Sequence, residues 1–318
     1  MHSIPLQSNI AICSGTSHPE LTSRICNHLN LEQEKVKVIR FPDGEIFAQY
    51  QENLRNKDLF IVQPTCSPTN ETLMELFIMV DAAKRASVQR ITVVLPYYGY
   101  GRQDRKDKPR VPITAKLVAN LLTTSGVDRV LTIDLHAQQI QGFFDIPVDH
   151  LYCSPVLVPY MKEKLGKDLI VVAPDSGGVK MAQAYADMLE AGLAVVSKRR
   201  IDAVSVESSH LVGDVDGRKC VITDDLTSTA GTLIAAANLL MEKGATEVYA
   251  AISHCLLSAE GEKKLEESCI KELITTDAVP IPEVLDCHKI KVLSIAPLLG
   301  DAIMRIHSGE SVSSLFSV

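Results

Sequence analysis

Short apolar runs alternate with longer amphipathic segments along most of the chain. Residues 59–62, 91–95 and 130–133 are apolar runs bounded by polar turns, as buried strands are. Between them, residues 71–86 and 113–124 repeat apolar side chains at helical spacing. Strands that alternate with helices predict an α/β fold on a mainly parallel sheet flanked by helices, with functional loops at the carboxyl ends of the strands.

One early segment departs from this alternation. Residues 36–41 and 45–50 each alternate apolar and polar side chains, as half-buried strands do, and Pro42-Asp43-Gly44 separates them. Two such runs joined by a short turn predict a β-hairpin near residues 36–50. A hairpin placed early in an α/β domain is expected to project from it.

The order of strand, Thr/Ser-rich loop, apolar helix and strand occurs twice, at residues 58–95 and 219–252. The match is one of pattern, and any two βαβ units look partly alike, but duplication is the favoured interpretation. A chain of 318 residues is long enough for two domains. Residues 145–150 are a reasonable boundary, so we predict domains at 1–150 and 151–318.

The second half continues the α/β pattern until it reaches a polar segment. Strands are predicted at 169–173 and 193–197, and residues 201–212 are polar without clear periodicity. This segment is predicted to be a mobile flap. Lys198 and Arg200 lie at its start, where they could close over a charged ligand and exclude water.

Composition narrows the class of protein. Hydrophobic residues make up 46% of the chain and charged residues 22%, which is ordinary for a soluble globular protein. The net charge of −7 argues against a general nucleic-acid surface, and no apolar run approaches the roughly 20 residues that span a bilayer. The eight scattered cysteines contain no C-x-x-C pair and are predicted to be reduced thiols, such as Cys220 in the core. We therefore predict a cytoplasmic protein that binds neither nucleic acid nor membranes.

The strongest candidate for chemistry is the stretch 221–232. A β-branched run leads into Asp224 and Asp225, and a turn of small residues at 228–232 precedes a helical pattern. Backbone N–H groups at a helix N-terminus can bind a phosphate, while the two carboxylates can accept hydrogen bonds from sugar hydroxyls. An ordinary βα turn is the alternative, and two adjacent acids at a strand end make it the weaker one.

A basic cluster and a pair of metal-ligand candidates also follow predicted strands. Residues 102–110 hold five basic and two acidic side chains; such runs are usually solvated loops, but the place after a strand suits a polyphosphate. His136 and Asp175 would ordinarily be a turn residue and an N-cap. Together they could hold Mg²⁺ beside phosphates. The common nucleotide-binding glycine motifs are missing from the sequence, so a nucleotide must bind in another way.

Several ordered stretches resemble one family over nearly the full length, that of the ribose-phosphate pyrophosphokinases, or phosphoribosyl pyrophosphate synthetases. The matching stretches are 102–107, 134–137, 139–147, 174–178, 198–200, 224–232 and 309–313. The resemblance implies two phosphoribosyltransferase-like domains, with the last residues packing back on the first. It also implies transfer of the diphosphoryl group of MgATP to the 1-hydroxyl of ribose 5-phosphate, giving phosphoribosyl pyrophosphate (PRPP) and AMP for nucleotide biosynthesis.

The resemblance implies a role for individual residues. Lys198 and Arg200 would be catalytic, and His136 and Asp175 would bind Mg²⁺. ATP would contact Phe41, Asp43, Glu45, Arg102, Gln103, Asp104 and His136. Ribose 5-phosphate would contact Asp224, Asp225, Ser228, Thr229, Ala230, Gly231 and Thr232. In the family a neighbouring subunit supplies the adenine hairpin, so a homo-oligomer that shares its active sites is expected, a hexamer being favoured over a tetramer.

The resemblance also implies a regulatory site, and the chain differs from the family's pattern at two places. Members that phosphate activates and ADP inhibits build an anion site between subunits, at positions matching Arg55, Lys106, Gln141, Ser311 and Ser313. Ser228 replaces a third acid of the family's Asp-Thr-Ala-Gly-Thr pattern, so ribose binding could be weaker or altered. The segment 201–205 also lacks the Pro and Asn of many bacterial members.

Two rival functions stay open at this point. A phosphoribosyltransferase that consumes PRPP would share the sugar-phosphate turn, but the hairpin, the basic cluster and the second domain argue against it. A non-catalytic subunit, like the family's synthetase-associated proteins, is favoured only by Ser228.

Overall fold

The computed structural model describes residues 9–199, 208–281 and 287–316. The chain divides into two compact units. Unit 1 contains Met1–Tyr152, Ala278–Pro280 and Ile295–Ser317, and unit 2 contains Cys153–Asp277 and Ile281–Ser294. Each unit has a largely parallel sheet between helices, so the predicted α/β fold class is confirmed.

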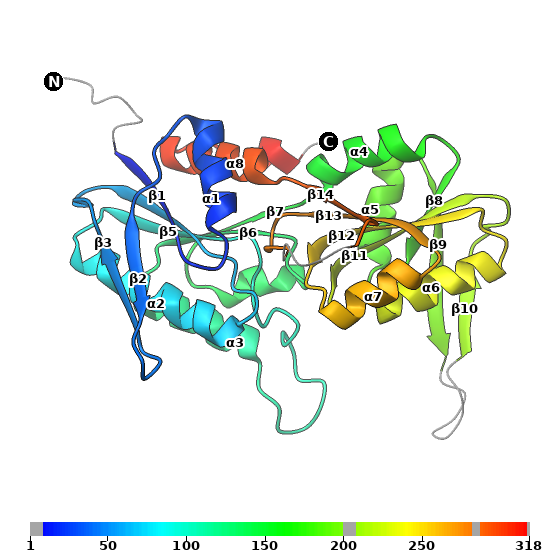
Figure 1. Ribbon diagram of the computed structural model, residues 1–318, viewed down its shortest axis with the longest axis horizontal. Helices are drawn as coiled ribbons and strands as arrows, with labels where there is room; N and C mark the ends of the chain where they lie inside the picture. The colour runs from blue at the N-terminus through cyan, green and yellow to red at the C-terminus, as the bar shows by residue number, and fades with distance from the viewer. Residues whose placement is uncertain (1–8, 200–207, 282–286, 317–318) are drawn as a thin grey trace. The chain divides into compact units, whose positions relative to one another are not determined.

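Unit 1 is built on a parallel five-stranded sheet in the order β1-β4-β5-β6-β7. Its strands are β1 (Ile10–Ser14), β4 (Asp58–Val62), β5 (Arg90–Leu95), β6 (Arg129–Ile133) and β7 (Val148–Leu151). Helices α2 (Thr69–Arg85) and α3 (Thr114–Ser125) cover one face, and α1 (Pro19–Leu29) and α8 (Ala296–Ser308) cover the other (Figure 1). Because both faces are covered, the central strands are continuous apolar runs in the sequence.

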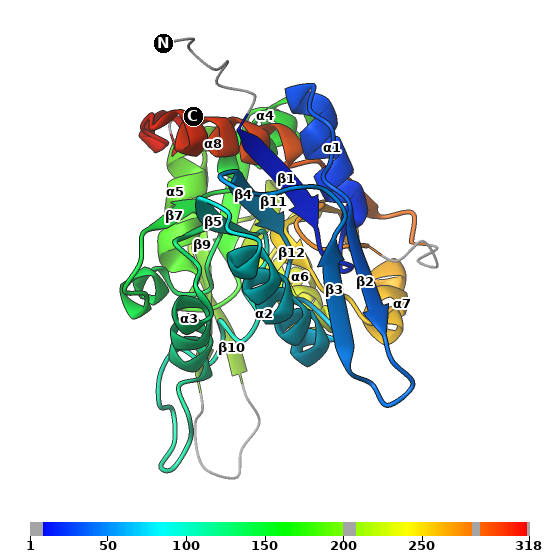
Figure 2. The same ribbon diagram turned by 90° about the vertical axis from the view of Figure 1, so that its left-hand side faces the viewer.

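The predicted hairpin is confirmed as β2 (Val36–Arg40) paired antiparallel with β3 (Ile46–Tyr50). Its turn projects beyond the sheet of unit 1 (Figure 2). Two contacts hold the hairpin against α2, one at each end of its paired strands: the Tyr50 hydroxyl donates to the Met79 carbonyl at 3.0 Å, and Arg40, next to the turn, pairs with Glu71 at 2.7 Å. The strands of the hairpin are therefore held along α2, while the turn at residues 41–45 is exposed.

Unit 2 contains a seven-stranded sheet in the order β10-β9-β8-β11-β12-β13-β14. The strands are β8 (Leu169–Ala173), β9 (Gly192–Arg199), β10 (Ser208–Val212), β11 (Lys219–Thr227), β12 (Glu247–Cys255), β13 (Ile270–Thr276) and β14 (Ile290–Leu293). Helices α4 (Ser154–Leu165) and α5 (Val179–Leu189) lie on one face, with α6 (Gly231–Glu242) and α7 (Ala259–Glu267) on the other. Every strand pair is parallel except β9 with β10.

Strand β10 corrects the prediction of a flap over 201–212. Residues 208–212 pair antiparallel with β9, in a register that sets Ser209 opposite Lys198 and Val212 opposite Val195. The segment Ser-Ser-His-Leu-Val has little apolar periodicity because it forms an edge strand, which gains its order from backbone pairing with β9. The remaining flap positions, 200–207, lie outside the described residues.

The two units are wound in the same order. Unit 1 runs β1, α1, an antiparallel hairpin, β4, α2, β5, α3, β6 and β7, and unit 2 runs β8, α5, the antiparallel β9–β10 pair, β11, α6, β12, α7, β13 and β14. Each last strand is followed by a helix, and the two helices are exchanged: α4 packs on α5 of unit 2, and α8 packs on α1 of unit 1. This correspondence supports the duplication hypothesis.

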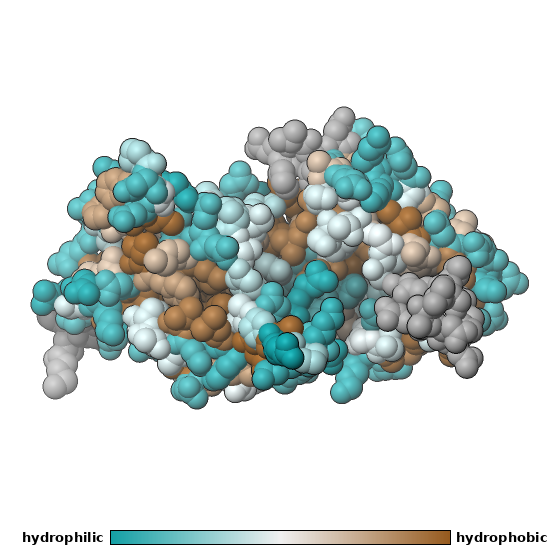
Figure 3. Space-filling view, turned by 90° about the horizontal axis from the view of Figure 1, so that it is seen from below, coloured by the Kyte–Doolittle hydropathy of each residue, from teal (hydrophilic) through white to brown (hydrophobic). Residues whose placement is uncertain are grey.

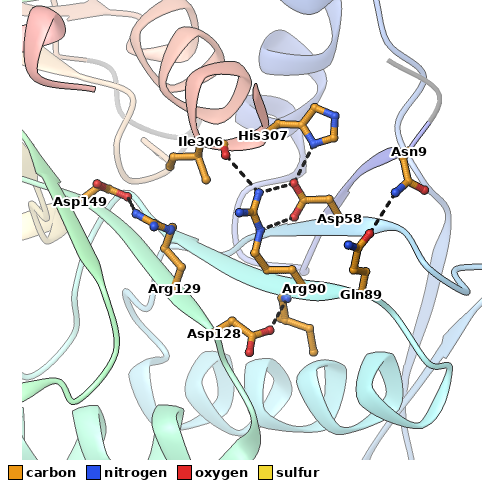
Figure 4. A network of polar contacts seen from close by, with 10 residues as sticks. Asn9, Asp58, Gln89, Arg90, Asp128, Arg129, Asp149, Ile306 and His307 are labelled. Carbon is orange, nitrogen blue, oxygen red and sulfur yellow. Dashed lines mark hydrogen bonds and ion pairs between the residues drawn. The ribbon is translucent and has the colours of Figure 1, made fainter. Parts of the chain in front are cut away.

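A partly buried ionic network fastens α8 to the sheet of unit 1 (Figure 4). Arg90 binds both carboxylate oxygens of Asp58, Nε to Oδ1 at 2.8 Å and Nη2 to Oδ2 at 2.5 Å. His307 Nδ1 lies 2.7 Å from the same Oδ2, and Arg90 also donates to the Ile306 carbonyl at 3.1 Å. Asp58 and Arg90 begin β4 and β5, so this network lies at the amino ends of the strands, away from the carboxyl ends where functional loops are predicted.

The cysteines and the helices bear on two predictions from the composition, reduced thiols and no membrane-spanning segment. The eight cysteines are free, and burial raises the pKa of the Cys220 thiol to about 12, so the predicted core thiol is confirmed. Within the described residues, no helix has the length and apolar character needed to cross a membrane.

Candidate active site

The carboxylate pair lies near the carboxyl end of β11. Asp225 is buried, Asp224 is half-buried, and the Asp225 N–H donates to Asp224 Oδ1 at 2.9 Å. Burial, then the neighbouring charge of Asp225 and the more distant charge of Asp175, raises the pKa of Asp224 from 3.8 to about 7. Negative charge is therefore concentrated at this edge, and a bound cation would relieve it.

The turn that follows leads directly into α6. Ala230 adopts a left-handed conformation with φ of 57°, and α6 begins at Gly231. Thr229, Gly231 and Thr232 are exposed, and the first N–H groups of a helix have no acceptor within the helix, so this end of α6 can bind an anion. The predicted sequence of strand, acidic pair, turn and helix is confirmed; the binding of a sugar phosphate there is a prediction.

A neighbouring segment supports this turn, and the sequence analysis did not identify it. The N–H groups of Leu256 and Ser258 donate to the carbonyls of Thr227 and Ser228 at 2.8 and 3.1 Å. A Cβ atom at Gly261 would lie 3.1 Å from the Ser228 carbonyl oxygen, so a larger residue here would push the turn away by a few tenths of an ångström. A serine before Ala259–Glu267 could have marked the start of α7, which Ser258 caps by accepting from the Gly261 N–H at 3.2 Å, but not the contact of α7 with the turn.

Asp175 lies after β8, the strand next to β11 in the sheet. Its Oδ1 accepts hydrogen bonds from the N–H groups of Gly177 and Gly178, at 2.8 and 3.1 Å. It therefore orders the turn before α5, but the N-cap of that helix is Gly178, so the N-cap interpretation of Asp175 was wrong. The exposed carboxylate also contributes to the raised pKa of Asp224, so it faces the same edge of the sheet.

The two basic residues assigned to the flap are only partly described. Lys198 belongs to β9, where its backbone pairs with Ser209 of β10. Arg200 lies outside the described residues. Their catalytic role stays a prediction.

In unit 1, the predicted ligand His136 lies just past the end of β6 and is exposed. A Cβ atom at Gly101 would lie 3.7 Å from the His136 Cβ, which places the loop before the basic cluster against this histidine. Gln139 Nε2 donates to Asp104 Oδ2 at 3.3 Å and joins the same two loops. The structure thus brings His136 and the start of the basic cluster to one edge of the sheet.

The other predicted ATP contacts are exposed and locally ordered. Gln103 accepts from the Thr114 hydroxyl at 2.5 Å, at the start of α3, and Arg102 beside it is exposed. In the hairpin turn, the Phe41 N–H donates to the Glu45 carbonyl at 2.8 Å, and the Glu45 N–H donates to Asp43 Oδ1 at 3.1 Å. The Phe41 ring is 44% exposed, as an aromatic platform for a flat ring must be.

Two of the five residues of the predicted allosteric anion site, Gln141 and Ser311, have side chains in local polar contacts. The Ser313 N–H donates to Ser311 Oγ at 3.2 Å, in the turn after α8. Arg55 and Lys106 are exposed, and the Gln141 amide lies 3.3 Å from His150. These contacts do not test the anion site, which stays a prediction.

The donor set suits Mg²⁺ held by few protein ligands. Among the described residues, no three His, Cys, Asp or Glu side chains are arranged to hold a metal ion. Mg²⁺ prefers carboxylate, phosphate and water oxygens and usually takes few ligands from protein. The carboxylates of Asp175, Asp224 and Asp225, with their excess negative charge, fit such an ion. His136 belongs to unit 1 and Asp175 to unit 2, and their pairing around a metal stays a prediction.

Two α/β units of one winding order, the second with an acidic strand end and a small-residue turn before a helix, give this chain the fold of the phosphoribosylpyrophosphate synthetases. Residues 10–126 match the N-terminal domain of ribose phosphate pyrophosphokinase, and residues 203–317 match the phosphoribosyl synthetase-associated domain. The chain belongs to the ribose-phosphate pyrophosphokinase family.

Individual relatives match over nearly the full length. A ribose-phosphate pyrophosphokinase of Caldanaerobacter subterraneus is 50% identical over 311 residues, 98% of each chain. Ribose-phosphate pyrophosphokinase A of Dictyostelium discoideum is 49% identical over 310 residues, 97% of this chain and 98% of that one. The crystal structure of phosphoribosylpyrophosphate synthetase from Mycobacterium smegmatis is 42% identical, with a TM-score of 0.91 over 95% of this chain and 100% of that chain.

Proposed function

We propose that the protein is a ribose-phosphate diphosphokinase, which transfers the diphosphoryl group of ATP to ribose 5-phosphate. The products are PRPP, a precursor in nucleotide biosynthesis, and AMP. The observation that carries this proposal is the acidic strand end and turn of unit 2, in a chain that is about half identical to named pyrophosphokinases along its whole length.

The chemistry is a displacement at the β-phosphorus of ATP. The 1-hydroxyl oxygen of ribose 5-phosphate forms a bond to this phosphorus, the bond from phosphorus to the oxygen bridging the α-phosphate breaks, and AMP leaves with that oxygen. The hydroxyl proton is released. Alignment of the two substrates and neutralisation of charge are the main demands on the protein.

The residues divide these tasks between the substrates. The N–H groups at the start of α6 bind the 5-phosphate, and Asp224 and Asp225 fix the ribose hydroxyls. The Phe41 ring receives adenine. Lys198 and Arg200 neutralise the charge that develops on the diphosphoryl group.

Mg²⁺ supplies further charge neutralisation when it is bound. We assign its binding to His136 at the ATP phosphates and to Asp175 with the Asp224–Asp225 pair at the ribose. The raised pKa of Asp224 supports this assignment, because a nearby divalent cation would restore the ionised form.

A second copy of this chain is the proposed partner. Exposed apolar side chains gather on α2 and α3: Met74 is 56% exposed, Leu117 53% and Leu121 44%. Brown apolar areas spread over this side of unit 1 when the molecule is seen from below (Figure 3). Exposed apolar surface of this kind suits a subunit interface, so we propose that the protein is a homo-oligomer whose hairpins complete neighbouring active sites. We propose a hexamer located in the cytoplasm.

The test is to measure AMP from ATP and ribose 5-phosphate in the presence of Mg²⁺. Formation of AMP and PRPP in equal amounts supports the proposal. Release of pyrophosphate from PRPP only when a nucleobase is added would identify a phosphoribosyltransferase. A folded protein that makes no AMP, but alters turnover of an active family member, would identify a regulatory subunit.

A further inference from the structure

We infer that His150 is a positioning residue, which holds the backbone that carries His136. This inference rests on the proposed function, in which His136 binds Mg²⁺ at the ATP phosphates. His150 itself contacts neither substrate in this assignment. It lies on β7, and its side chain is buried while His136 is exposed.

One hydrogen bond carries the argument. The backbone N–H of Leu135, the residue before His136, donates to His150 Nε2 at 2.9 Å, and the bond is buried. A nitrogen that accepts a hydrogen bond carries no proton of its own, so the neutral ring has its proton on Nδ1. The other ring nitrogen, Nδ1, lies 3.3 Å from the Gln141 amide nitrogen. In this state Nδ1 and the Gln141 amide nitrogen both carry protons, so their approach is a contact and not a hydrogen bond, and the ring holds the His136 loop through the Leu135 N–H.

The backbone at this point needs such support. Asp134 follows β6 with φ of 39°, in the left-handed region that a non-glycine residue adopts at a cost. Its N–H donates to the Leu151 carbonyl at 3.0 Å, so β7 supplies both acceptors, one from its backbone and one from a side chain. The ring of Tyr152 packs 4.8 Å from the His150 ring, centroid to centroid, and restricts its rotation.

Unit 2 provides an internal comparison. There Asp277 follows β13, and its N–H donates to the Leu293 carbonyl of β14 at 3.1 Å, which repeats the pairing of Asp134 with Leu151. The strand registers agree as well, since Ile133 is opposite Leu151 and Thr276 is opposite Leu293. The position that matches His150 is Val292, whose side chain cannot accept a hydrogen bond. A side-chain acceptor thus occurs at this position in unit 1, whose loop carries His136, and not in unit 2. The fold itself therefore does not require it.

The size of the effect follows from two principles. Loss of the His150 acceptor would leave the buried Leu135 N–H without its partner, which is unfavourable. Because the loop is in a strained conformation, it can move and expose this N–H to water. Groups that orient a metal ligand typically change metal affinity or activity by roughly 10–100-fold when they are removed. We therefore expect the loss to appear in the metal requirement more than in overall stability.

The experiment compares His150→Gln with His150→Met. Both side chains reach as far from Cβ as Nε2 does, but only glutamine offers an oxygen that accepts the Leu135 N–H. We expect His150→Met to raise the half-saturating Mg²⁺ concentration for AMP formation about 10-fold or more. His150→Gln should stay within about threefold of the wild type, because it keeps the acceptor.

A second readout does not depend on turnover. Hydrogen–deuterium exchange of the peptide covering residues 129–137 should become faster in His150→Met and stay near the wild-type rate in His150→Gln. Equal exchange in both variants would overturn the inference, and so would equal Mg²⁺ requirements. Parallel losses of activity and melting temperature in both variants would also overturn it, since they would mean that the ring acts only by packing. If the wild type forms no AMP while the exchange rates differ as expected, the proposed function has failed and the positioning role has not.

Discussion

Replacing Asp224 by asparagine should stabilise the ligand-free protein while it removes activity. The pKa of this carboxyl is raised from 3.8 to about 7 because it is partly buried beside Asp225 and shares an edge with Asp175. A shift of this size corresponds to about 4 kcal/mol, at ~1.4 kcal/mol for each pKa unit. Since Asp224 keeps some exposure to water, which screens the repulsion, we expect about 2 kcal/mol.

The sign follows from proton linkage. The folded protein holds the Asp224 proton more tightly than the unfolded chain does, so this stability is present below about pH 4 and is lost as the pH rises through about 7. Asparagine carries no charge at any pH, and its side-chain oxygen can still accept the Asp225 N–H that Asp224 Oδ1 accepts at 2.9 Å. The variant should therefore gain most at pH 8 and much less at pH 5.

Thermal unfolding of the ligand-free protein measures this difference. At pH 8 the Asp224→Asn midpoint should exceed the wild-type midpoint by about 4–8 °C, taking ~2–4 °C for each kcal/mol. Asp187→Asn is the matched control, because it removes an exposed carboxylate of α5 and should leave the midpoint almost unchanged. The reasoning is refuted if Asp224→Asn is no more stable than the wild type at pH 8, or if its advantage does not shrink at pH 5.

Three further substitutions test other parts of the molecule. Asp58→Asn should lower the melting midpoint, at a cost below the roughly 3–5 kcal/mol for breaking a fully buried ion pair, since the Arg90 side chain is 33% exposed to screening water; an unchanged midpoint would mean that the network with Arg90 and His307 does not stabilise unit 1. Gly261→Ala should raise the KM for ribose 5-phosphate several-fold with a smaller change in the KM for ATP, because its Cβ would press on the Ser228 carbonyl; steady-state kinetics would refute this if both KM values moved equally. Lys198→Ala should lower kcat at least 100-fold with little change in ATP affinity, if it acts on the transferring group; turnover close to wild type would remove it from the mechanism.

Most helices and strands could be predicted because their buried faces produce a regular spacing of apolar residues in the sequence. The strand predicted at 59–62 is seen at Asp58–Val62, and the helix predicted over 113–124 is Thr114–Ser125. These segments are covered on one or both faces, so their apolar spacing reflects their packing. Strand β10 was missed because an edge strand is specified by backbone pairing with its neighbour, which composition does not report.

The candidate site shows the same limit at the level of side chains. The carboxylate pair and the turn before α6 could be found, because chemistry-bearing residues stood together in one short stretch. His150 and Gly261 could not, since each acts on a residue that is distant in sequence and reached only through the fold. The raised pKa of Asp224 was also invisible, as it depends on burial, on the charge of Asp225 and, to a smaller degree, on Asp175 from the turn after β8.

The exchange of the last helices has a consequence for the order of events during synthesis. The Asp58 carboxylate leaves the ribosome early, but its partner His307 and the rest of α8 are made more than two hundred residues later. Unit 2 is complete once Ser294 has emerged, whereas unit 1 must wait for α8 to cover α1 and the strand ends. The half of the protein that is translated first is therefore the half that finishes folding last, the reverse of the usual sequence of domains on the ribosome.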